Sequence, residues 1–170
     1  MSGIDYDTEW INIDGNHVHR TAIIHPNVKM GTGNWIGAYS VIGGNGEIRG
    51  VDQKGFEGSV WIGNNNVISE HVTIQRPYTG GSATVVESNC IIMAHAHIGH
   101  DAYIGDKVEI CSAVVVGGHA TIDDGSRIKM RAVIRNRVIV EFGTTVGMGA
   151  VVTKNTMYNT TVYGNPAKEH

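Results

Sequence analysis

The sequence predicts an all-β, single-domain protein built as a parallel β-helix of six-residue repeats. Three observations predict this fold: an aliphatic residue recurs at every sixth position, glycine is abundant while proline is rare, and the apolar residues are mainly β-branched. The chain has 170 residues, with 23 glycines, 3 prolines, 41% hydrophobic and 6% aromatic residues. This length suits one domain with its own core. A helical bundle is disfavoured because valine, isoleucine and threonine prefer strands.

The six-residue period is interrupted twice. Its aliphatic positions are Val18, Ile24, Met30, Ile36, Ile42 and Ile48, then Ile62, Ile68 and Ile74, then every sixth residue from Val86 to Val152. A second register, four positions later, holds small or medium residues from Cys90 to Ala150. One large and one small inward residue per repeat suit a narrow coil in which stacked repeats bury a continuous core. Three repeats, 18 residues, would close one triangular turn.

The period also delimits the parts of the domain. Residues 1–17 precede it and should cap the first coil, residues 18–155 form the β-helix, and residues 156–170 leave it as a C-terminal tail. The interruptions should be loops near 49–61 and 75–85, because a coil absorbs extra residues only by ejecting them. Such loops often hold substrates, and tolerated surface insertions are the alternative.

Glycine often follows the aliphatic position, as at Gly99 and Gly117. We expect these glycines at corners where the backbone takes a conformation that a Cβ would oppose. Corner residues should therefore mark the boundaries between the short strands.

Charge and hydropathy exclude several classes of protein. The net charge is −3 and no basic run occurs, so neither nucleic acid nor an anionic membrane is an expected partner. No 18-residue apolar run and no secretory signal occur, which predicts a cytoplasmic protein without membrane insertion. Cys90 and Cys111 fit no metal-binding spacing and should be reduced thiols.

Histidines are concentrated in Met93-Ala-His-Ala-His-Ile-Gly-His-Asp101. Since positions repeat every 18 residues, Asp101, His119 and Arg137 should lie in successive coils, roughly 4.8 Å apart. His100 and Asp101 fall on the turn side of their repeat and should point outward. An imidazole beside a carboxylate is a candidate general base, because the carboxylate can orient the ring and tune its pKa. Metal binding, metal-free proton abstraction and a merely solvated polar surface remain open.

Three stretches resemble a known family: His95-Ala-His-Ile-Gly-His-Asp101, Val116-Gly-Gly-His119, and the segment from Ile62 to Arg76. They are similar to the UDP-N-acetylglucosamine acyltransferases of lipid A biosynthesis, and the resemblance spans roughly residues 18–166. It implies a left-handed parallel β-helix, a handedness that the general rule for parallel connections does not predict. It also implies a homotrimer with active sites in the clefts between subunits.

The resemblance further implies roles for individual residues. His100 would be the general base, Asp101 its partner, and the backbone N–H of Gly118 would face the developing oxyanion. The implied substrate-binding residues are His97, His119, Arg135, Asp52 and Lys54. The implied residues for the acyl donor are Met148, Gly149 and Lys154. No metal and no bound cofactor are expected; the co-substrate would be an acyl thioester of acyl carrier protein or coenzyme A.

Two features depart from that family. Arg135 replaces a histidine of the family, and its C-terminal helical domain has no counterpart before His170. Instead, the segments Val146 to Lys154 and Tyr163 to Lys168 resemble the tail of coenzyme A-dependent sugar acetyltransferases. The predicted reaction is therefore acyl transfer, without a covalent intermediate, to a hydroxyl or amine of a sugar or nucleotide sugar. Met148 favours a short acyl group, because it stands where the lipid A enzymes can carry a space-leaving glycine.

Two other classes stay as alternatives. A metalloenzyme like the γ-class carbonic anhydrases could use His95 and His100, which are five residues apart. A non-catalytic trimeric scaffold would carry its histidines merely as corner residues. Metal analysis and thioester consumption distinguish these alternatives from an acyltransferase.

Overall fold

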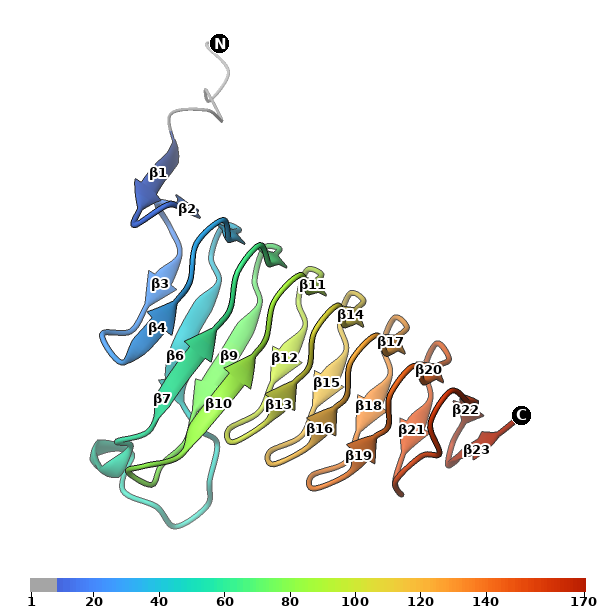
Figure 1. Ribbon diagram of the computed structural model, residues 1–170. Helices are drawn as coiled ribbons and strands as arrows, with labels where there is room; N and C mark the ends of the chain where they lie inside the picture. The colour runs from blue at the N-terminus through green and yellow to red at the C-terminus, as the bar shows by residue number, and fades with distance from the viewer. Residues whose placement is uncertain (1–8) are drawn as a thin grey trace, which may run out of the picture.

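The computed structural model describes residues 9–170, which form one triangular prism of parallel strands (Figure 1). Face A contains, in spatial order, β1 (Trp10–Ile13), β2 (Asn16–His19), β5 (Trp35–Ile36), β8 (Val67–Ile68), β11 (Ile91–Ile92), β14 (Glu109–Ile110), β17 (Arg127–Ile128), β20 (Thr145–Val146), β22 (Thr161–Gly164) and β23 (Ala167–Glu169). Face B contains β3 (Ile23–Ile24), β6 (Val41–Asn45), β9 (Thr73–Arg76), β12 (His97–Ile98), β15 (Val115–Val116), β18 (Val133–Ile134) and β21 (Val151–Val152). Face C contains β4 (Val28–Met30), β7 (Ser59–Ile62), β10 (Ala83–Val86), β13 (Tyr103–Ile104), β16 (Thr121–Ile122) and β19 (Ile139–Val140).

The core follows the predicted period. Ile98 pairs in register with Val116, which pairs with Ile134, so each aliphatic residue stacks on its equivalent 18 residues later. These side chains are buried, as are the small residues of the second register from Cys90 to Ala150. Ile48 is an exception to the prediction, because β6 ends at Asn45 and Ile48 lies in an excursion, only partly buried.

At Gly99 and Gly117, glycine is needed for a different reason than predicted. The left-handed backbone conformation falls three residues after the aliphatic position, on Asp101 (φ 59°), His119 (φ 58°) and Arg137 (φ 65°). At Gly99 the difficulty is space, because a Cβ there would lie 2.7 Å from the backbone nitrogen of Gly118 in the next coil. A Cβ at Gly117 would meet the nitrogen of Asn136 at the same distance. These glycines therefore permit close stacking of coils.

Both ends of the prism finish in antiparallel hairpins. β1 pairs with β2 before the first coil, and β23 folds back on β22 after the last. The expected cap at 1–17 is thus described from residue 9 onward, while residues 1–8 lie outside the described part. Among the described residues, no helix is long and apolar enough to cross a membrane.

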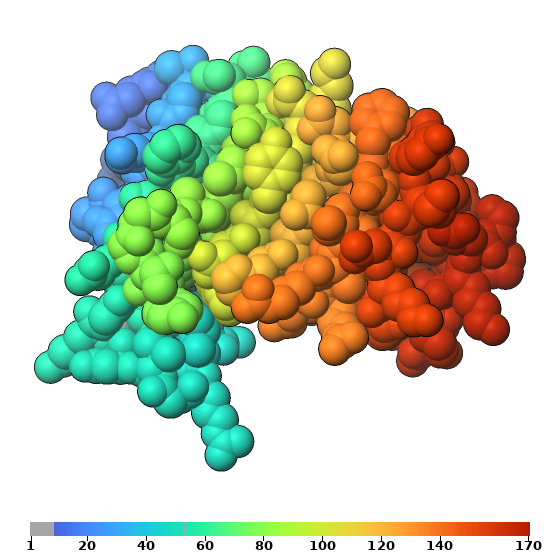
Figure 2. All heavy atoms as spheres, turned by 60° about the horizontal axis from the view of Figure 1, so that its bottom comes forward, coloured from blue at the N-terminus to red at the C-terminus, as the bar shows by residue number. Residues whose placement is uncertain are grey.

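Two excursions leave the coil at 46–58 and 77–82. The first follows β6 and contains the 3-10 turn η2 (Gln53–Gly55), and the second follows β9. Both leave from the corner between faces B and C, and the N–H of Gly58 donates to the carbonyl of Pro77 at 3.2 Å. Figure 2 shows them together as a projection from the prism. The interruptions of the period therefore produce loops on one corner.

Candidate active site

The corner between faces B and C also carries the histidine cluster. His100, Gly118, Asn136 and Lys154 occupy one position in four successive coils, because the strands before them are in register. The N–H of His119 donates to the carbonyl of His100 at 2.9 Å, which confirms that the 101 and 119 corners stack. The two excursions stand in the coils just before His100. The corner therefore brings loops and histidines together.

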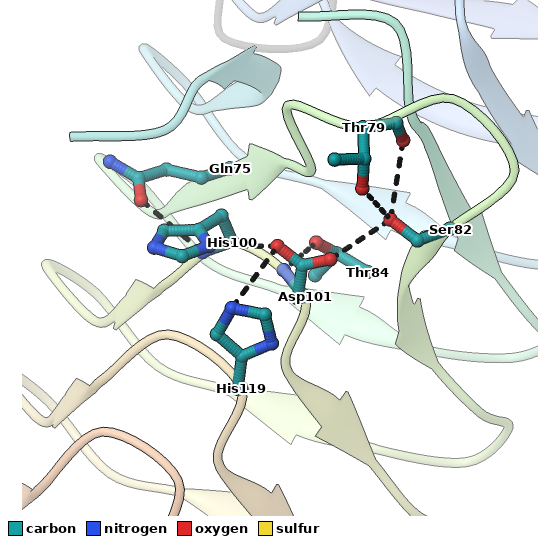
Figure 3. A network of polar contacts seen from close by, with 7 residues as sticks. All are labelled: Gln75, Thr79, Ser82, Thr84, His100, Asp101 and His119. Atoms are coloured by element: carbon teal, nitrogen blue, oxygen red, sulfur yellow. Dashed lines mark hydrogen bonds and ion pairs between the residues drawn. The ribbon is translucent and has the colours of Figure 1, made fainter. Parts of the chain in front are cut away.

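His100 and Asp101 form a hydrogen-bonded pair (Figure 3). The Nδ1 of His100 lies 2.8 Å from Oδ2 of Asp101, and the side chains are only 13% and 10% exposed. Ser82 donates its hydroxyl to Oδ1 of Asp101 at 2.9 Å, and the N–H of Asp101 donates to Oγ1 of Thr84 at 2.8 Å. Since an ionised carboxylate only accepts, His100 carries its proton on Nδ1 and keeps a lone pair on Nε2.

The outward orientation of this pair agrees with its position in the repeat, yet water reaches little of it. The second excursion supplies Ser82, and the first places Gly46 between His100 and Phe56, since a Cβ on Gly46 would lie 3.0 Å from Cβ of His100 and from Cε1 of Phe56. The two excursions thus cover the His100–Asp101 pair, which lies outside the coil. A partly desolvated His–Asp pair is well suited to proton transfer.

The ring of His100 lies directly over Gly118. A Cβ at Gly118 would be 2.5 Å from Nε2 of His100, so only glycine fits beneath the ring. Within residues 9–170 the N–H of Gly118 has no hydrogen-bond acceptor. Nε2 of His100 and the backbone of Gly118 lie beside the same space. This space is a hollow of about 220 Å³ lined by Glu47, Gln75, His97, Gly99, His100, Val115, Gly117, Gly118 and Asn136.

His97 lies on β12 at the edge of this hollow. Its Nδ1 is hydrogen-bonded to the hydroxyl of Thr73 at 2.7 Å. Burial lowers the pKa of His97; Glu47 opposes this shift and His100 adds to it. His97 is therefore uncharged at neutral pH and can donate or accept one hydrogen bond through Nε2.

His119 lies one coil beyond the pair. Its Nε2 is 3.8 Å from Oδ2 of Asp101, and its ring meets that of His100 edge to face at 5.1 Å. Burial lowers the pKa of His119 against the attraction of Asp101, and Arg137 and His100 lower it further. His119 thus forms an uncharged outer wall of the site. His100, Asp101 and His119 are also the described group that could hold a metal ion, with ligand atoms within 4.8 Å of one another.

The other predicted site residues lie at different distances from this hollow. Arg135 and Lys154 are exposed on the same corner, beyond His119. Asp52 and Lys54 lie on the first excursion, where the carboxylate of Asp52 accepts from the backbone N–H of Lys54 at 3.0 Å. Neither lines the hollow.

The predicted residues for the acyl donor divide between two corners. Lys154 is on the His100 corner, whereas Met148 and Gly149 lie on the corner between faces A and B. Met148 is 69% exposed. One protomer therefore does not bring Met148 and His100 together.

Sequence reasoning missed several residues of the site: Glu47, Gln75, Ser82, Thr84 and Asn136. The period could have found Gln75, which directly follows an aliphatic position as Gly99 does, and Asn136, which is 18 residues after Gly118. Glu47 and Ser82 belong to the excursions. No repeat places an excursion residue, so no sequence signal was available for them.

Comparison with known proteins extends these observations. The family model for the bacterial transferase hexapeptide (six repeats) matches residues 83–118. An acyl-[acyl-carrier-protein]–UDP-N-acetylglucosamine O-acyltransferase from Gloeothece citriformis is 33% identical over 146 residues, covering 86% of this chain and 52% of the relative. The chain thus spans about half the length of the curated relatives it matches.

Solved structures show the same fold. The UDP-N-acetylglucosamine acyltransferase of Arabidopsis has a TM-score of 0.77 at 21% identity, with 90% of this chain and 73% of that chain covered. The enzyme from Francisella novicida has a TM-score of 0.74 at 24% identity, with 93% and 69% covered. These likenesses confirm the predicted fold class, a left-handed parallel β-helix.

Fold and repeat together define a hexapeptide-repeat protein of the β-helix class. Within that class, the chain is related to the UDP-N-acetylglucosamine O-acyltransferases, as the resemblance of its histidine motif predicted.

Proposed function

We propose that this protein is an acyltransferase that moves an acyl group from a thioester to a hydroxyl or amine of a sugar or nucleotide sugar. One observation carries the proposal: Nδ1 of His100 is held by Asp101, while Nε2 lies over Gly118, whose N–H has no acceptor within residues 9–170. The sequence relatives, named as acyltransferases that use acyl carrier protein and UDP-N-acetylglucosamine, support it.

The proposed reaction uses both sides of the hollow. Nε2 of His100 takes the proton of the acceptor hydroxyl or amine as its oxygen or nitrogen attacks the thioester carbonyl. The N–H of Gly118 donates to the oxyanion that forms. Collapse of this intermediate breaks the carbon–sulfur bond, and the leaving thiolate takes the proton from His100. Asp101 stabilises the transient imidazolium, and no acyl-enzyme forms.

The remaining side chains are assigned to binding. His97 and His119 are uncharged hydrogen-bonding groups beside His100, suited to hydroxyls of the acceptor. Arg135 and Lys154 are exposed cations further along the corner, suited to phosphate groups of the nucleotide sugar or of the thioester carrier. Asp52 and Lys54 would contact substrate from the first excursion.

We further propose that the protein is a homotrimer with face B turned toward the threefold axis. The outward row of face B includes Ile23, Val41, Val115, Val133 and Val151 and no charged residue. Face A carries Glu109 and Arg127 in its outward row, and face C carries Lys29. An uncharged face whose outward row is aliphatic apart from Thr73 and His97 is the one best covered by other copies. In such a trimer Met148 and Gly149 could approach a donor bound at a neighbouring His100.

The test is acyl transfer by the purified protein. Acyl carrier protein and coenzyme A thioesters of two to fourteen or so carbons would be combined with a panel of nucleotide sugars and free amino sugars, and products identified by mass. We expect one acylated acceptor and stoichiometric free thiol. Thiol release without an acylated product, or no release from any donor, would contradict the proposal.

A metalloenzyme of the γ-class carbonic anhydrase type is the second candidate, because the ligand atoms of His100, Asp101 and His119 lie within 4.8 Å. Elemental analysis separates the two. About one zinc, cobalt or iron per chain, together with loss of activity on chelation, would favour this candidate. The proposed acyltransferase should be active without stoichiometric metal.

A further inference from the structure

The corner between faces A and B carries an aromatic ladder: Tyr39, His71 and His95, one ring above another. The rings of Tyr39 and His71 are stacked with centroids 5.2 Å apart, and those of His71 and His95 with centroids 4.8 Å apart and planes within 3°. All three residues are exposed. Within residues 9–170, the ring nitrogens of His71 and His95 have no hydrogen-bond partner. Nothing in the described part of the protomer accounts for this row of unused polar edges.

The ladder and the candidate active site lie at the two edges of face B, at matching heights. His95 and His100 flank β12 in one coil. One coil earlier, His71 precedes β9 and the excursion at 77–82 follows it; Tyr39 and the excursion at 46–58 flank β6 in the same way. Each ring of the ladder thus has a part of the site as its counterpart across the face.

Threefold symmetry brings these two edges together. When three copies turn the same face toward a common axis, the A/B corner of each copy meets the B/C corner of the next, because the contact is heterologous and closes into a ring. Rotation about an axis along the prism does not change height. His95 of one copy therefore stands opposite His100 of its neighbour.

We propose that the aromatic ladder of one protomer forms the second wall of its neighbour's acceptor site, where ring nitrogens of His71 and His95 hydrogen-bond the acceptor beside His100. The inference rests on the proposed acyltransferase function and trimer. Imidazole edges offer a donor or an acceptor to a hydroxyl-rich ligand, and stacking holds their orientation. Losing both imidazole rings should lower kcat/KM for the acceptor at least tenfold, because each hydrogen bond contributes about 1 kcal/mol net.

Subunit complementation tests the functional part. His100→Ala and the double variant His71→Ala/His95→Ala would be co-expressed with different tags, and trimers carrying both tags purified. If the two sets of residues meet across subunits, every trimer that carries both tags has one of its three clefts with both wild-type walls, so about a third of wild-type activity returns. Activity no greater than the average of the two parents would overturn the proposal. His17→Ala, an exposed histidine on face A, is the matched control and should be as active as wild type.

Crosslinking tests the placement without using activity. In the variant His95→Cys/His100→Cys, a bis-maleimide should join neighbouring chains into covalent dimers and trimers, since Cys90 and Cys111 are buried. Chains that stay monomeric on a denaturing gel would overturn the proposed placement. If wild type transfers no acyl group while the chains crosslink, the proposed function fails and the shared cleft stands.

Discussion

At the scale of single residues, the site depends on how His100 is held. Three hydrogen bonds hold Asp101: its carboxylate accepts from Nδ1 of His100 and from the hydroxyl of Ser82, and its backbone N–H donates to Oγ1 of Thr84. These contacts set the tautomer of His100, and Gly118 leaves room for its Nε2. A small number of short-range contacts therefore decides whether the site can act as a base.

His100→Ala should abolish most turnover and leave the fold intact. A positioned general base typically contributes about 10² to 10⁴-fold in rate, and this ring lies outside the coil core. Initial rates and thermal unfolding of the two proteins would be compared. An unfolding temperature that drops with the rate would indicate a structural role, and ordinary activity would place the base elsewhere.

Acidification should reduce stability through His97. Burial lowers the pKa of His97 in the folded protein below the ordinary value of about 6.5 that the unfolded chain keeps. As pH falls through 6.5 the unfolded chain therefore binds the proton first, and the free energy of unfolding decreases. His97→Gln should make the free energy of unfolding less dependent on pH between 7 and 5.5, measured by denaturant titration. An unchanged dependence would show that other groups carry it.

At the scale of elements, two-residue strands leave most of the structure to the corners. Several corners combine a residue in the left-handed region with a glycine where coils approach closely, as at Gly99 and Asp101. The B/C corner additionally ejects both excursions, so the element that closes a coil also supplies the lid over His100. The corners therefore both allow the coils to stack and position the loops that cover His100.

Gly117→Ala should destabilise the protein by about 1–3 kcal/mol, because the new Cβ would lie 2.7 Å from a backbone nitrogen of the next coil, which must shift. Gly55→Ala is the matched control: nothing lies within 4 Å of its Cβ. Denaturant midpoints of both variants would be measured. Equal midpoints would mean that the coils separate more easily than the contact suggests.

At the scale of the whole molecule, the prism presents three different outward rows. Face B has no charged residue in its row, and its two edges carry the aromatic ladder and the candidate active site. A ring of three copies covers the outward row of face B and brings the aromatic ladder of one copy to the candidate active site of the next. Assembly and catalysis are therefore expected to depend on the same surface.

Val133→Glu should convert the trimer into monomers, since it places a charge in the middle of face B, where Val133 is 38% exposed. Thr121→Glu, at the same strand position on face C, should leave the assembly unchanged. Light scattering at micromolar concentration measures both. A wild-type protein that is monomeric would contradict the assembly, and a trimeric Val133→Glu variant would place its interface elsewhere.

By itself, the sequence determined the coil, its core and the vertical neighbours. Parallel strands that stack with a constant 18-residue offset make Asp101 and His119 adjacent wherever the period is unbroken, and make Ile98 and Val116 core residues. Only the tertiary structure decided which residues complete the site. Ser82 and Glu47 come from excursions, where no period relates sequence distance to position, and their approach to His100 depends on how loops pack against the corner. The six-residue period predicts the position of each residue of the coil, whereas the position of a loop residue depends on tertiary packing.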